Sequence, residues 1–584
     1  MTAEVPTRLF SEQQWRQLFP LLNSLDQSQR LWLSGYLAAP EWGAATATTV
    51  VADTAERVTI AYGTETDNCK RLAHQLEARC REAGIAAEVV DLAQTRVRRL
   101  TKMKYLVVIT ATHGDGDPPE PITDFYENLN ADDMSPLKGL RFAVLALGDS
   151  TYENYCVTGQ IIDQRLEALG GERLIPRRDC DVDFAQPADE WMTQLLPTLP
   201  RAAAATPAVD HSAAYSSAPA AASYSKDSPL EVEVLANHSL SHPDRSHPIH
   251  HLELELPVAD FPLLPGDAVG VLPENPPQLV ASILDATGLS GEAPVVVDDQ
   301  AMSLVEALRI HRDLTIPSRG FLSAWAALSD AQWLQDINAG EAKAQREFLR
   351  QHQVCDLVRR APARPEPQAL VDALRPQQPR LYDLANCLEV NEDELHLTVK
   401  AFSYPFGERE EIGIATTFLL DLQPGDSLRI YPHRNARFQL PENTELPLIL
   451  VAEGTGIAPY RAFLQALAQR ATPPPCWLVF AEQQFEEDFL YQTDLQKALA
   501  DKVLTSLDSV FYSDEPRRQL ADPLLDNAER LNDWLAQGAH IYLCGEKDSL
   551  DVCEARLQEQ LDKNHSEGFW KQLSKDKRVH RNLY

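Results

Sequence analysis

The chain has 584 residues, too many for one hydrophobic core, so we expect three or four structural units. Its formal net charge of −33 argues against nucleic acid as a partner and allows a basic protein partner or simply high solubility. Nine scattered cysteines, without a CxxC pair or Cys/His metal spacing, argue against a metal site and favour a reducing cytosol. The N-terminus has no apolar signal-peptide core, and no window approaches the ~18 apolar residues of a membrane span. We therefore expect a soluble, cytoplasmic protein.

The first half of the chain predicts three parts. Residues 1–56 contain two short amphipathic helices followed by an Ala/Thr-rich linker, which together form a small helical cap. Residues 57–200 alternate apolar β runs with helical stretches, and this alternation predicts a parallel sheet with helices on both faces. Residues 201–228 are rich in Ala, Ser and Pro, which is typical of a flexible tether.

The second half predicts two further parts. Residues 229–445 begin and end with β runs, which predict a β-barrel, and a proline-punctuated helical insert occupies about 276–375. Residues 446–584 return to alternating β and α runs, which predict a second α/β domain. The fold class expected from the sequence is therefore multidomain α/β.

Three loops in the first α/β part follow three predicted strands: "GTETDN" (63–68), "TATHGDGDPP" (110–119) and "LGDSTYENYC" (147–156). Such loops meet at the carboxyl edge of a parallel sheet, where ligands bind. The first offers hydroxyls and a helix N-terminus for a phosphate. The second has glycines that allow close approach of a flat ligand. The third places Tyr152 and Tyr155 where an aromatic ring can stack on that ligand.

Four motifs mark the second half of the chain. They are "RLYDLA" (380–385), "GIATTFL" (413–419), "EGTGIAPYRAF" (453–463) directly after an apolar strand, and "IYLCGE" (541–546). A GxG pair that opens a helix after a strand allows close approach of a dinucleotide pyrophosphate. The second motif starts a helix whose N–H groups can bind a pyrophosphate.

These motifs and their order resemble the diflavin reductases over nearly the whole chain. Residues 58–199 look like a flavodoxin-type FMN domain, and residues 228–584 look like the ferredoxin–NADP reductase module with a connecting insert. Within this family the likeness is greatest to the flavoprotein (alpha) subunits of bacterial NADPH-dependent sulfite reductases, whose helical cap resembles residues 11–39.

The resemblance implies that FMN, FAD and NADPH bind this chain. FMN is expected to contact Thr64, Glu65, Thr66, Asp67 and Asn68 in the first loop, Thr112, His113, Gly114, Asp115 and Gly116 in the second, and Leu147, Gly148, Asp149, Tyr152 and Asn154 in the third. FAD is expected to contact Arg380, Leu381, Tyr382, Asp383, Thr398, Gly413, Ala415, Thr416 and Thr417. Arg380 would pair with the FAD pyrophosphate, because a planar guanidinium suits phosphate oxygens, and Tyr382 would stack on the isoalloxazine.

For the nicotinamide nucleotide, the resemblance implies contacts from Gly454, Thr455 and Gly456 and from a basic 2′-phosphate site containing Ser513, Arg517 and Arg518. Cys544 would lie near the nicotinamide. Tyr584 would cover the flavin and move for hydride transfer; the alternative for Tyr584 is that it belongs to a frayed chain end. Asp514 could instead bond a ribose 2′-hydroxyl, so NADH stays possible beside NADPH.

Several positions depart from the family pattern. Asp67 replaces a glycine beside the expected phosphate, where a carboxylate repels it by roughly 1 kcal/mol or more, so we expect weakened but retained FMN binding. The hydride-transfer group reads Asp383, Cys544 and Asn582 in place of Ser, Cys and Asp, so the carboxylate changes sides. Leu520 stands at the family's tyrosine position and Ala481 at a glycine position. Asp383 either takes over the acidic role or marks a loss of activity.

The function implied by the resemblance is electron transfer from NADPH through FAD to FMN and on to a hemoprotein sulfite reductase (beta) subunit, as part of cysteine biosynthesis. The helical cap also suggests a homo-oligomer. Two alternatives stay open. One is a diflavin reductase for another heme or metal acceptor. The other is a diverged paralogue with altered or lost use of flavin or nucleotide.

Overall fold

The computed structural model describes residues 57–65, 68–113, 116–131, 134–150, 152, 154–201, 224–242, 245, 247–258, 261–406, 409–443 and 445–584. The predicted helical cap and most of the predicted tether lie outside these residues. Within the described ranges, no helix combines the length and the apolar character needed to cross a membrane.

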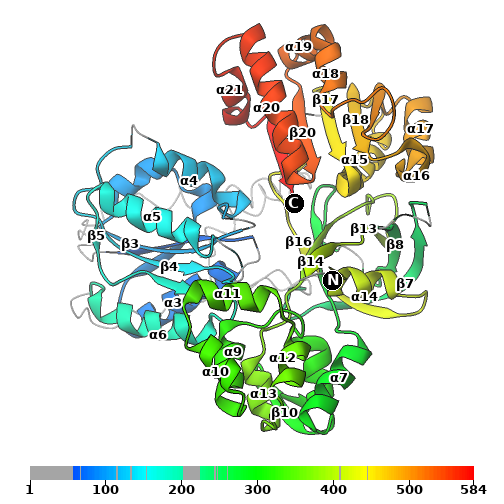
Figure 1. Ribbon diagram of the computed structural model, residues 1–584. Coiled ribbons are helices and arrows are strands. Elements are labelled where there is room, and N and C mark those ends of the chain that lie inside the picture. The colour runs from blue at the N-terminus through cyan, green and yellow to red at the C-terminus, as the bar shows by residue number, and fades with distance from the viewer. Residues whose placement is uncertain are drawn as a thin grey trace, which may run out of the picture. The chain divides into compact units, whose positions relative to one another are not determined.

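A parallel sheet forms the centre of the first α/β domain (Figure 1). Its strands lie in the order β2-β1-β3-β4-β5, with β6 beside β4. Their bounds are β1 Val58–Gly63, β2 Ala87–Asp91, β3 Tyr105–Ala111, β4 Arg141–Leu147, β5 Glu172–Arg173 and β6 Arg178–Cys180. The run at 172–182, which the sequence presents as one β stretch, forms two short strands on either side of Pro176. Proline has no N–H to donate to the sheet, which accounts for the interruption.

Helices cover both faces of this sheet, as the alternation predicted. Their bounds are α3 Asn68–Glu82, α4 Thr123–Asn130, α5 Val157–Ala168 and α6 Ala185–Leu195. One apolar layer packs α3 and α6 against the sheet, and the other packs α4 and α5 against the opposite face. In α3 the buried side chains recur at helical spacing, namely Cys69, Leu72, Ala73, Leu76 and Cys80.

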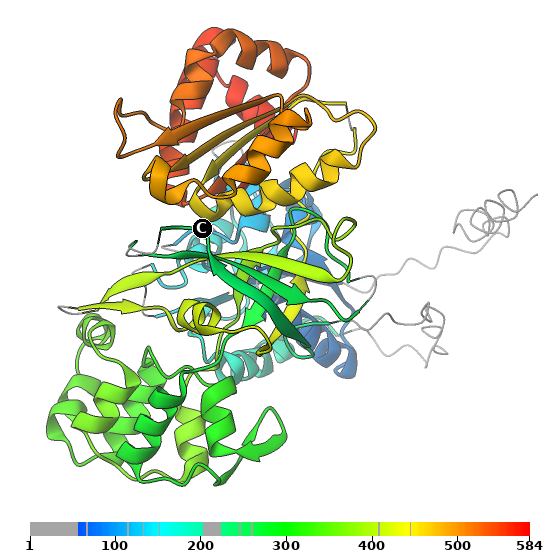
Figure 2. The same ribbon diagram turned by 90° about the vertical axis from the view of Figure 1, so that its right-hand side faces the viewer.

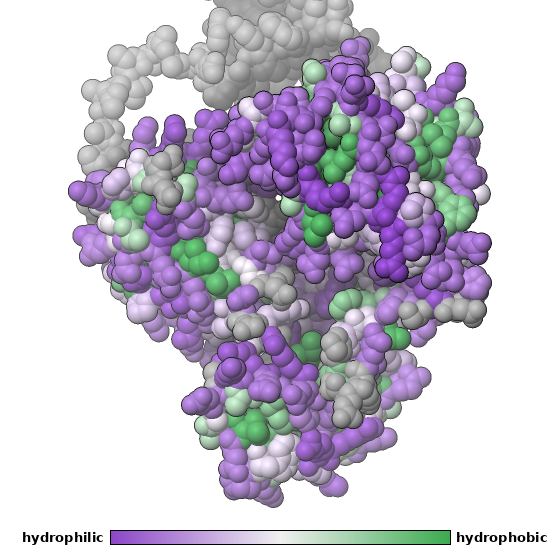
Figure 3. Space-filling view, turned by 45° about the horizontal axis from the view of Figure 1, so that its top comes forward, coloured by the Kyte–Doolittle hydropathy of each residue, from purple (hydrophilic) through white to green (hydrophobic). Residues whose placement is uncertain are grey.

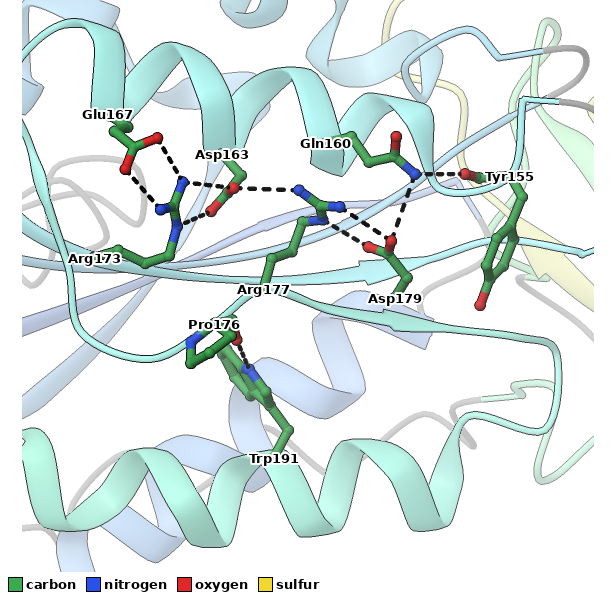
Figure 4. A network of polar contacts seen from close by, with 9 residues as sticks. All are labelled: Tyr155, Gln160, Asp163, Glu167, Arg173, Pro176, Arg177, Asp179 and Trp191. Carbon is green, nitrogen blue, oxygen red and sulfur yellow. Dashed lines mark hydrogen bonds and ion pairs between the residues drawn. The ribbon is translucent and has the colours of Figure 1, made fainter.

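A charged network holds α5, the helix that follows the third predicted flavin loop (Figure 4). The carboxylate of Asp163 is 4% exposed and accepts two hydrogen bonds of 2.9 Å from Arg173 and one of 3.2 Å from Arg177. Arg177 also pairs with Asp179, and the Gln160 amide at the start of α5 donates to the Tyr155 carbonyl. The network therefore ties α5 to the segment that follows it and, through Gln160, to Tyr155 just before it.

An antiparallel sheet follows in the order β12-β9-β16-β7-β8-β13. Its strands are β7 Leu230–Ser239, β8 Ile249–Glu255, β9 Ala268–Leu272, β12 Arg380–Asp383, β13 Glu394–Lys400 and β16 Ser427–His433. A bridge between Leu384 and Leu397 joins the two outer strands, so the sheet closes on itself around one apolar core. A hairpin of β14 Ser403–Phe406 and β15 Arg409–Ile412 leads into helix α14 Ile414–Asp421.

The insert in this sheet has a separate apolar core, in which Phe321 stacks on Trp325 with ring centroids 5.4 Å apart. Its elements are α7 Pro277–Thr287, β10 Pro294–Val297, β11 Gln300–Ser303, α8 Leu304–Glu306, a π-helical turn Ala307–His311, α9 Arg319–Leu328, α10 Gln332–Asn338, α11 Ala342–Arg350, α12 Val354–Arg360 and α13 Pro367–Ala373. The predicted helical character of the insert is confirmed, with one β-hairpin added.

A second parallel sheet, in the order β19-β18-β17-β20-β21, forms the C-terminal domain. Its strands are β17 Leu448–Glu453, β18 Cys476–Glu482, β19 Ser506–Phe511, β20 His540–Gly545 and β21 Val579–Leu583. Its helices are α15 Ile457–Ala468, α16 Phe485–Asp488, α17 Gln492–Ala500, α18 Asp522–Asp526, α19 Ala528–Ala536, α20 Lys547–Asn564 and α21 Phe569–Lys575. They lie on both faces of the sheet (Figure 2), over two apolar layers. The predicted fold class is confirmed.

All nine cysteines lie in the described part of the chain, where they are buried and form no disulfide bond. Burial raises the pKa of Cys80 to about 11 and that of Cys180, Cys476 and Cys553 to about 12. The surface seen in Figure 3 is mostly hydrophilic, with small scattered apolar areas. These thiols therefore belong to the interior.

Asp163 provides a test of the charged network. We expect Asp163→Ala to lower the free energy of unfolding of the first α/β domain by about 3–5 kcal/mol, because it leaves two arginines beside a buried, vacated site. Glu167→Ala is the matched control. Glu167 bonds the same Arg173 but is 58% exposed, so its loss should be much smaller than that of Asp163. Calorimetric unfolding measures both. Equal losses would contradict the assignment of stability to the buried carboxylate.

Candidate functional site

The first loop of the flavodoxin-like domain forms a cradle between β1 and α3. Helix α3 begins at Asn68, as predicted, and a helix N-terminus at this place suits an anion. The buried hydroxyl oxygen of Thr64 makes no hydrogen bond of ordinary geometry in the described part of the chain, although the Cys69 thiol lies beside it. An unused buried hydroxyl at a helix start fits a phosphate group. Thr66 and Asp67 lie outside the described residues.

Glu65 places a carboxylate in this expected phosphate loop, and that carboxylate is paired with a histidine. Its Oε2 lies 2.6 Å from Nδ1 of His113 in the second loop. The pairing turns the carboxylate toward an imidazole, so Glu65 links two loops instead of standing unpaired beside a phosphate.

The second and third loops approach each other closely at Gly116. Its φ is +131°, and a Cβ there would lie 2.7 Å from the Cβ of Asn154 in the third loop. Only glycine therefore allows this contact. Thr112 donates its N–H to the Leu147 carbonyl, 2.9 Å away, at the same edge. Gly148 is equally confined, because a Cβ would lie 2.9 Å from the Cys156 nitrogen. Gly114 and Asp115 lie outside the described residues.

Tyr152 and Asp149 in the third loop have different surroundings. Tyr152 is 48% exposed, so its ring is accessible for stacking on a flat ligand. Asp149 Oδ2 accepts a hydrogen bond of 2.7 Å from Arg375, which follows the helical insert and is only 6% exposed. No motif in the sequence points to Arg375. Its Nε and Nη1 make no hydrogen bond within the described residues.

The residues expected to hold FAD lie mainly at one end of the antiparallel sheet. Arg380 is exposed, and its Nη1 donates to the carbonyls of Gln378 and Pro379 at 3.2 and 3.1 Å. Burial raises the pKa of Tyr382 to about 12, and Leu381 is 38% exposed. The Arg380 guanidinium and the Tyr382 phenol thus belong to the same strand, β12. Their spacing along the strand fits one group bound to the FAD pyrophosphate and one stacked on the flavin ring.

Helix α14 supplies the second expected FAD contact. Gly413 precedes its first turn, and the Thr416 hydroxyl and the Thr417 N–H both donate to the Gly413 carbonyl at 2.9 Å. Ala415 lies in the same first turn. Thr398 has different surroundings, because its buried hydroxyl lies 2.6 Å from the Tyr491 hydroxyl.

Asp383, Cys544 and Asn582, which are far apart in the sequence, come together in space. Cys544 and Asn582 face each other on the neighbouring strands β20 and β21, and Asp383 ends β12. The Asn582 amide donates to Asp383 Oδ1 at 2.8 Å, and the Cys544 thiol lies 3.7 Å from Oδ2. Burial raises the pKa of Asp383 to about 6, and these two hydrogen bonds limit the rise.

The GTG turn lies beside this group. Residues 454–456 form a 3₁₀ turn before α15, and a Cβ on Gly456 would lie 2.1 Å from the Cys544 carbonyl oxygen. Glycine is therefore required where the turn meets β20, and the same lack of a side chain allows a dinucleotide to approach. The Thr455 hydroxyl lies 2.6 Å from the Tyr584 hydroxyl.

Tyr584 is tied down rather than frayed. Its N–H donates to the Gly545 carbonyl at 3.2 Å, and its carbonyl accepts from the Lys547 N–H at 3.0 Å. Its side chain is nevertheless 56% exposed. Because the Tyr584 hydroxyl already contacts the Thr455 hydroxyl, a pyrophosphate that binds Thr455 has to displace Tyr584 from this contact.

The residues expected to bind the 2′-phosphate do not point toward a common site. Arg517 is 79% exposed and lies 3.7 Å from Glu515, whereas Arg518 bonds Asp526. The Ser513 N–H donates to the Gln483 carbonyl, and Asp514 accepts from the Phe485 N–H. A pocket of about 200 Å³ lies nearby, and its lining includes Arg556, which the sequence reasoning missed. The feature of the sequence that could have identified Arg556 is its helical spacing from Ser549, Val552 and Cys553.

Comparison with protein families and curated proteins agrees with this geometry. Residues 60–191 match the flavodoxin family, residues 222–418 match the FAD binding domain, and residues 450–553 match the oxidoreductase NAD-binding domain. The chain is 35% identical over 607 aligned residues to the "Sulfite reductase [NADPH] flavoprotein alpha-component" of Bacillus subtilis (strain 168), with both chains covered in full.

Two further relatives carry the same name. The Vibrio cholerae protein is 33% identical over 98% of this chain and 96% of its own length. The Escherichia coli (strain K12) protein is 32% identical, with both chains fully covered. The chain belongs to the sulfite reductase flavoprotein alpha-component family. It is therefore a diflavin oxidoreductase with flavodoxin, FAD-binding and NAD-binding domains, as its motifs indicated.

The pKa of Asp383 is directly testable. We expect Asn582→Leu to raise it above about 6, since the variant removes a hydrogen bond that favours the carboxylate. Difference infrared spectroscopy against pH follows the protonated carboxyl band, and Asp383→Asn identifies that band by its loss. An unchanged titration in Asn582→Leu would show that the 2.8 Å hydrogen bond does not act on the carboxylate.

Proposed function

We propose that this protein passes electrons from NADPH through FAD to FMN and on to a hemoprotein subunit that reduces sulfite. The single observation that carries the proposal is full-length similarity to sulfite reductase flavoprotein alpha-components. The meeting of Asp383, Cys544 and Asn582 between a FAD-binding strand and a nucleotide-binding sheet supports it. NADPH is named because the relatives carry it in their names.

The bound groups supply the hydride and one-electron chemistry, and the protein supplies binding and orientation. In the flavodoxin-like domain, Thr64 and the start of α3 would hold the FMN phosphate, and Tyr152 would stack on its ring. In the FAD-binding domain, Arg380 and the first turn of α14 would hold the pyrophosphate, and Tyr382 would stack on the ring. The GTG turn would hold the nicotinamide nucleotide.

Asp383 is proposed as the catalytic carboxylate. Asp383, when ionised, would stabilise the positive charge that a bound nicotinamide would acquire on giving up its hydride. Asn582 holds the carboxylate through Oδ1, and Cys544 lies against Oδ2. With a pKa of about 6, Asp383 is ionised at neutral pH and takes up a proton when the pH falls below this pKa.

The acceptor surface is proposed to lie on the flavodoxin-like domain, where an exposed FMN edge would meet the hemoprotein subunit. The second loop carries several carboxylates, including Asp117, and a negatively charged rim would steer encounter with a basic partner. The nine buried cysteines form no disulfide in the described residues, which supports a reducing compartment, so we place the reaction in the cytosol. Assembly through the N-terminal helical cap is part of this proposal.

Flavin content and electron transfer test the proposed function. The purified chain should release one FMN and one FAD on extraction and should reduce cytochrome c with NADPH. Adding the hemoprotein sulfite reductase subunit should then give sulfite-dependent NADPH oxidation. Cytochrome c reduction without sulfite-dependent turnover would indicate another acceptor. Absence of flavin, or of any turnover, would favour the diverged paralogue.

The pH dependence of flavin reduction tests the role of Asp383. We expect the stopped-flow rate to rise as pH increases through about 6, because ionisation creates the useful charge. Asp383→Asn should abolish this step and slow reduction by about tenfold or more. The exchanged variant, Asp383→Asn with Asn582→Asp, keeps both groups and should recover part of the rate. No recovery, together with a retained pH step in Asp383→Asn, would refute the assignment.

A further inference from the structure

The pocket between the end of β19 and helix α20 is not used by the groups described so far. Its volume of about 200 Å³ is below the roughly 300–1,000 Å³ typical of a pocket that holds a whole small-molecule ligand. It therefore suits one end of a larger ligand. Its lining is partly apolar and partly polar, and consists of Leu520, Ala521, Val552, Cys553, Tyr512, Gln519, Ser549 and Arg556.

The pocket connects to the GTG turn through Glu453, the residue that precedes Gly454. Burial raises the pKa of Glu453, and hydrogen bonds from Ser549 and Tyr512 oppose that rise. The hydroxyls of Ser549 and Tyr512 also lie 3.2 Å from each other. Glu453 Oε2 is buried and makes no hydrogen bond within the described residues. A dinucleotide with its pyrophosphate at the GTG turn would therefore reach the pocket past Glu453, whose Oε2 could accept a hydrogen bond from a ribose hydroxyl.

Arg556 is the only positively charged residue among the eight that line this pocket. Its Nη1 lies 2.7 Å from Gln519 Oε1 and 2.8 Å from Asp522 Oδ1. Asp522 is itself fixed, because its Oδ2 accepts the Gln519 N–H at 2.7 Å. The guanidinium is thus held at the pocket wall, and an aspartate is its present anionic partner.

We propose that Arg556 binds the 2′-phosphate of NADPH in this pocket and that Asp522 competes with the phosphate for the same guanidinium. A planar guanidinium suits phosphate oxygens, and a phosphate dianion carries more charge than the carboxylate it would displace. Arg518, by contrast, bonds Asp526 and does not line the pocket. This inference rests on the proposed use of NADPH and adds a residue that discriminates it from NADH.

Two measurements on the flavin-loaded full chain test the assignment. Calorimetry gives the affinity for adenosine 2′,5′-bisphosphate, and steady-state kinetics gives kcat/KM for NADPH and NADH. Arg556→Gln should weaken the bisphosphate and lower kcat/KM for NADPH by at least about tenfold, as expected for loss of a charge-assisted hydrogen bond. The value for NADH should change by less than about twofold, because NADH lacks the phosphate; this comparison also verifies folding.

Removing the competing carboxylate should have the opposite effect. Asp522→Asn keeps an oxygen for the Gln519 N–H and should tighten the bisphosphate by about two- to fivefold, since partly exposed ion pairs are weak. This gain should vanish in the Arg556→Gln background, because both changes act on one interaction.

Arg518→Gln is the matched control, which removes the same charge from a neighbouring site. It should change the affinity for the bisphosphate by less than about twofold. The assignment is overturned if Arg556→Gln leaves that affinity unchanged, or if Arg518→Gln weakens it more. If the wild-type chain oxidises neither nucleotide, the proposed function fails, but calorimetry with the bisphosphate still decides whether Arg556 binds a 2′-phosphate.

Discussion

The direction of a parallel sheet is the constraint on which both nucleotide-binding regions depend. Every strand of such a sheet ends at the same edge, so the loops that follow the strands meet there regardless of their distance in the sequence. In the flavodoxin-like domain this brings Glu65 to His113 and Gly116 to Asn154. In the C-terminal domain it brings the GTG turn to Cys544. The close contacts are possible because glycine occupies the tightest positions.

A second constraint acts between domains, at the carboxylate of Asp383. Strand β12 belongs to the antiparallel sheet, whereas Cys544 and Asn582 belong to the parallel one, and their hydrogen bonds join the two. An acid in this place has little water around it, which accounts for its raised pKa. Asp383 and Asn582 stand where the family pattern leads us to expect Ser and Asp, so the contact keeps one carboxylate and one neutral partner while the carboxylate moves from β21 to β12.

The sequence was sufficient for the parts of the site that depend on local patterns. Alternating β and α runs predicted both parallel sheets, and turn composition predicted the start of α3 at Asn68. The sequence was insufficient where tertiary packing determines which residues lie together. In the segment after β19, only the fold shows that Tyr512 lines a pocket while Arg517 faces solvent. Arg556 and Arg375 come from helical regions without a motif, so their roles depend on neighbours that are distant in the sequence.

The burial of all nine cysteines has a consequence for measuring motion between the flavin domains. Thiol-reactive dyes and spin labels attack the thiolate, and burial both shields these thiols and raises the pKa of several of them, as at Cys80 and Cys476. A cysteine introduced on the surface of each domain would therefore react well ahead of the native ones. Pairs of labels could then report distances in solution without a prior cysteine-free background, and all the native thiols that pack the cores would stay in place.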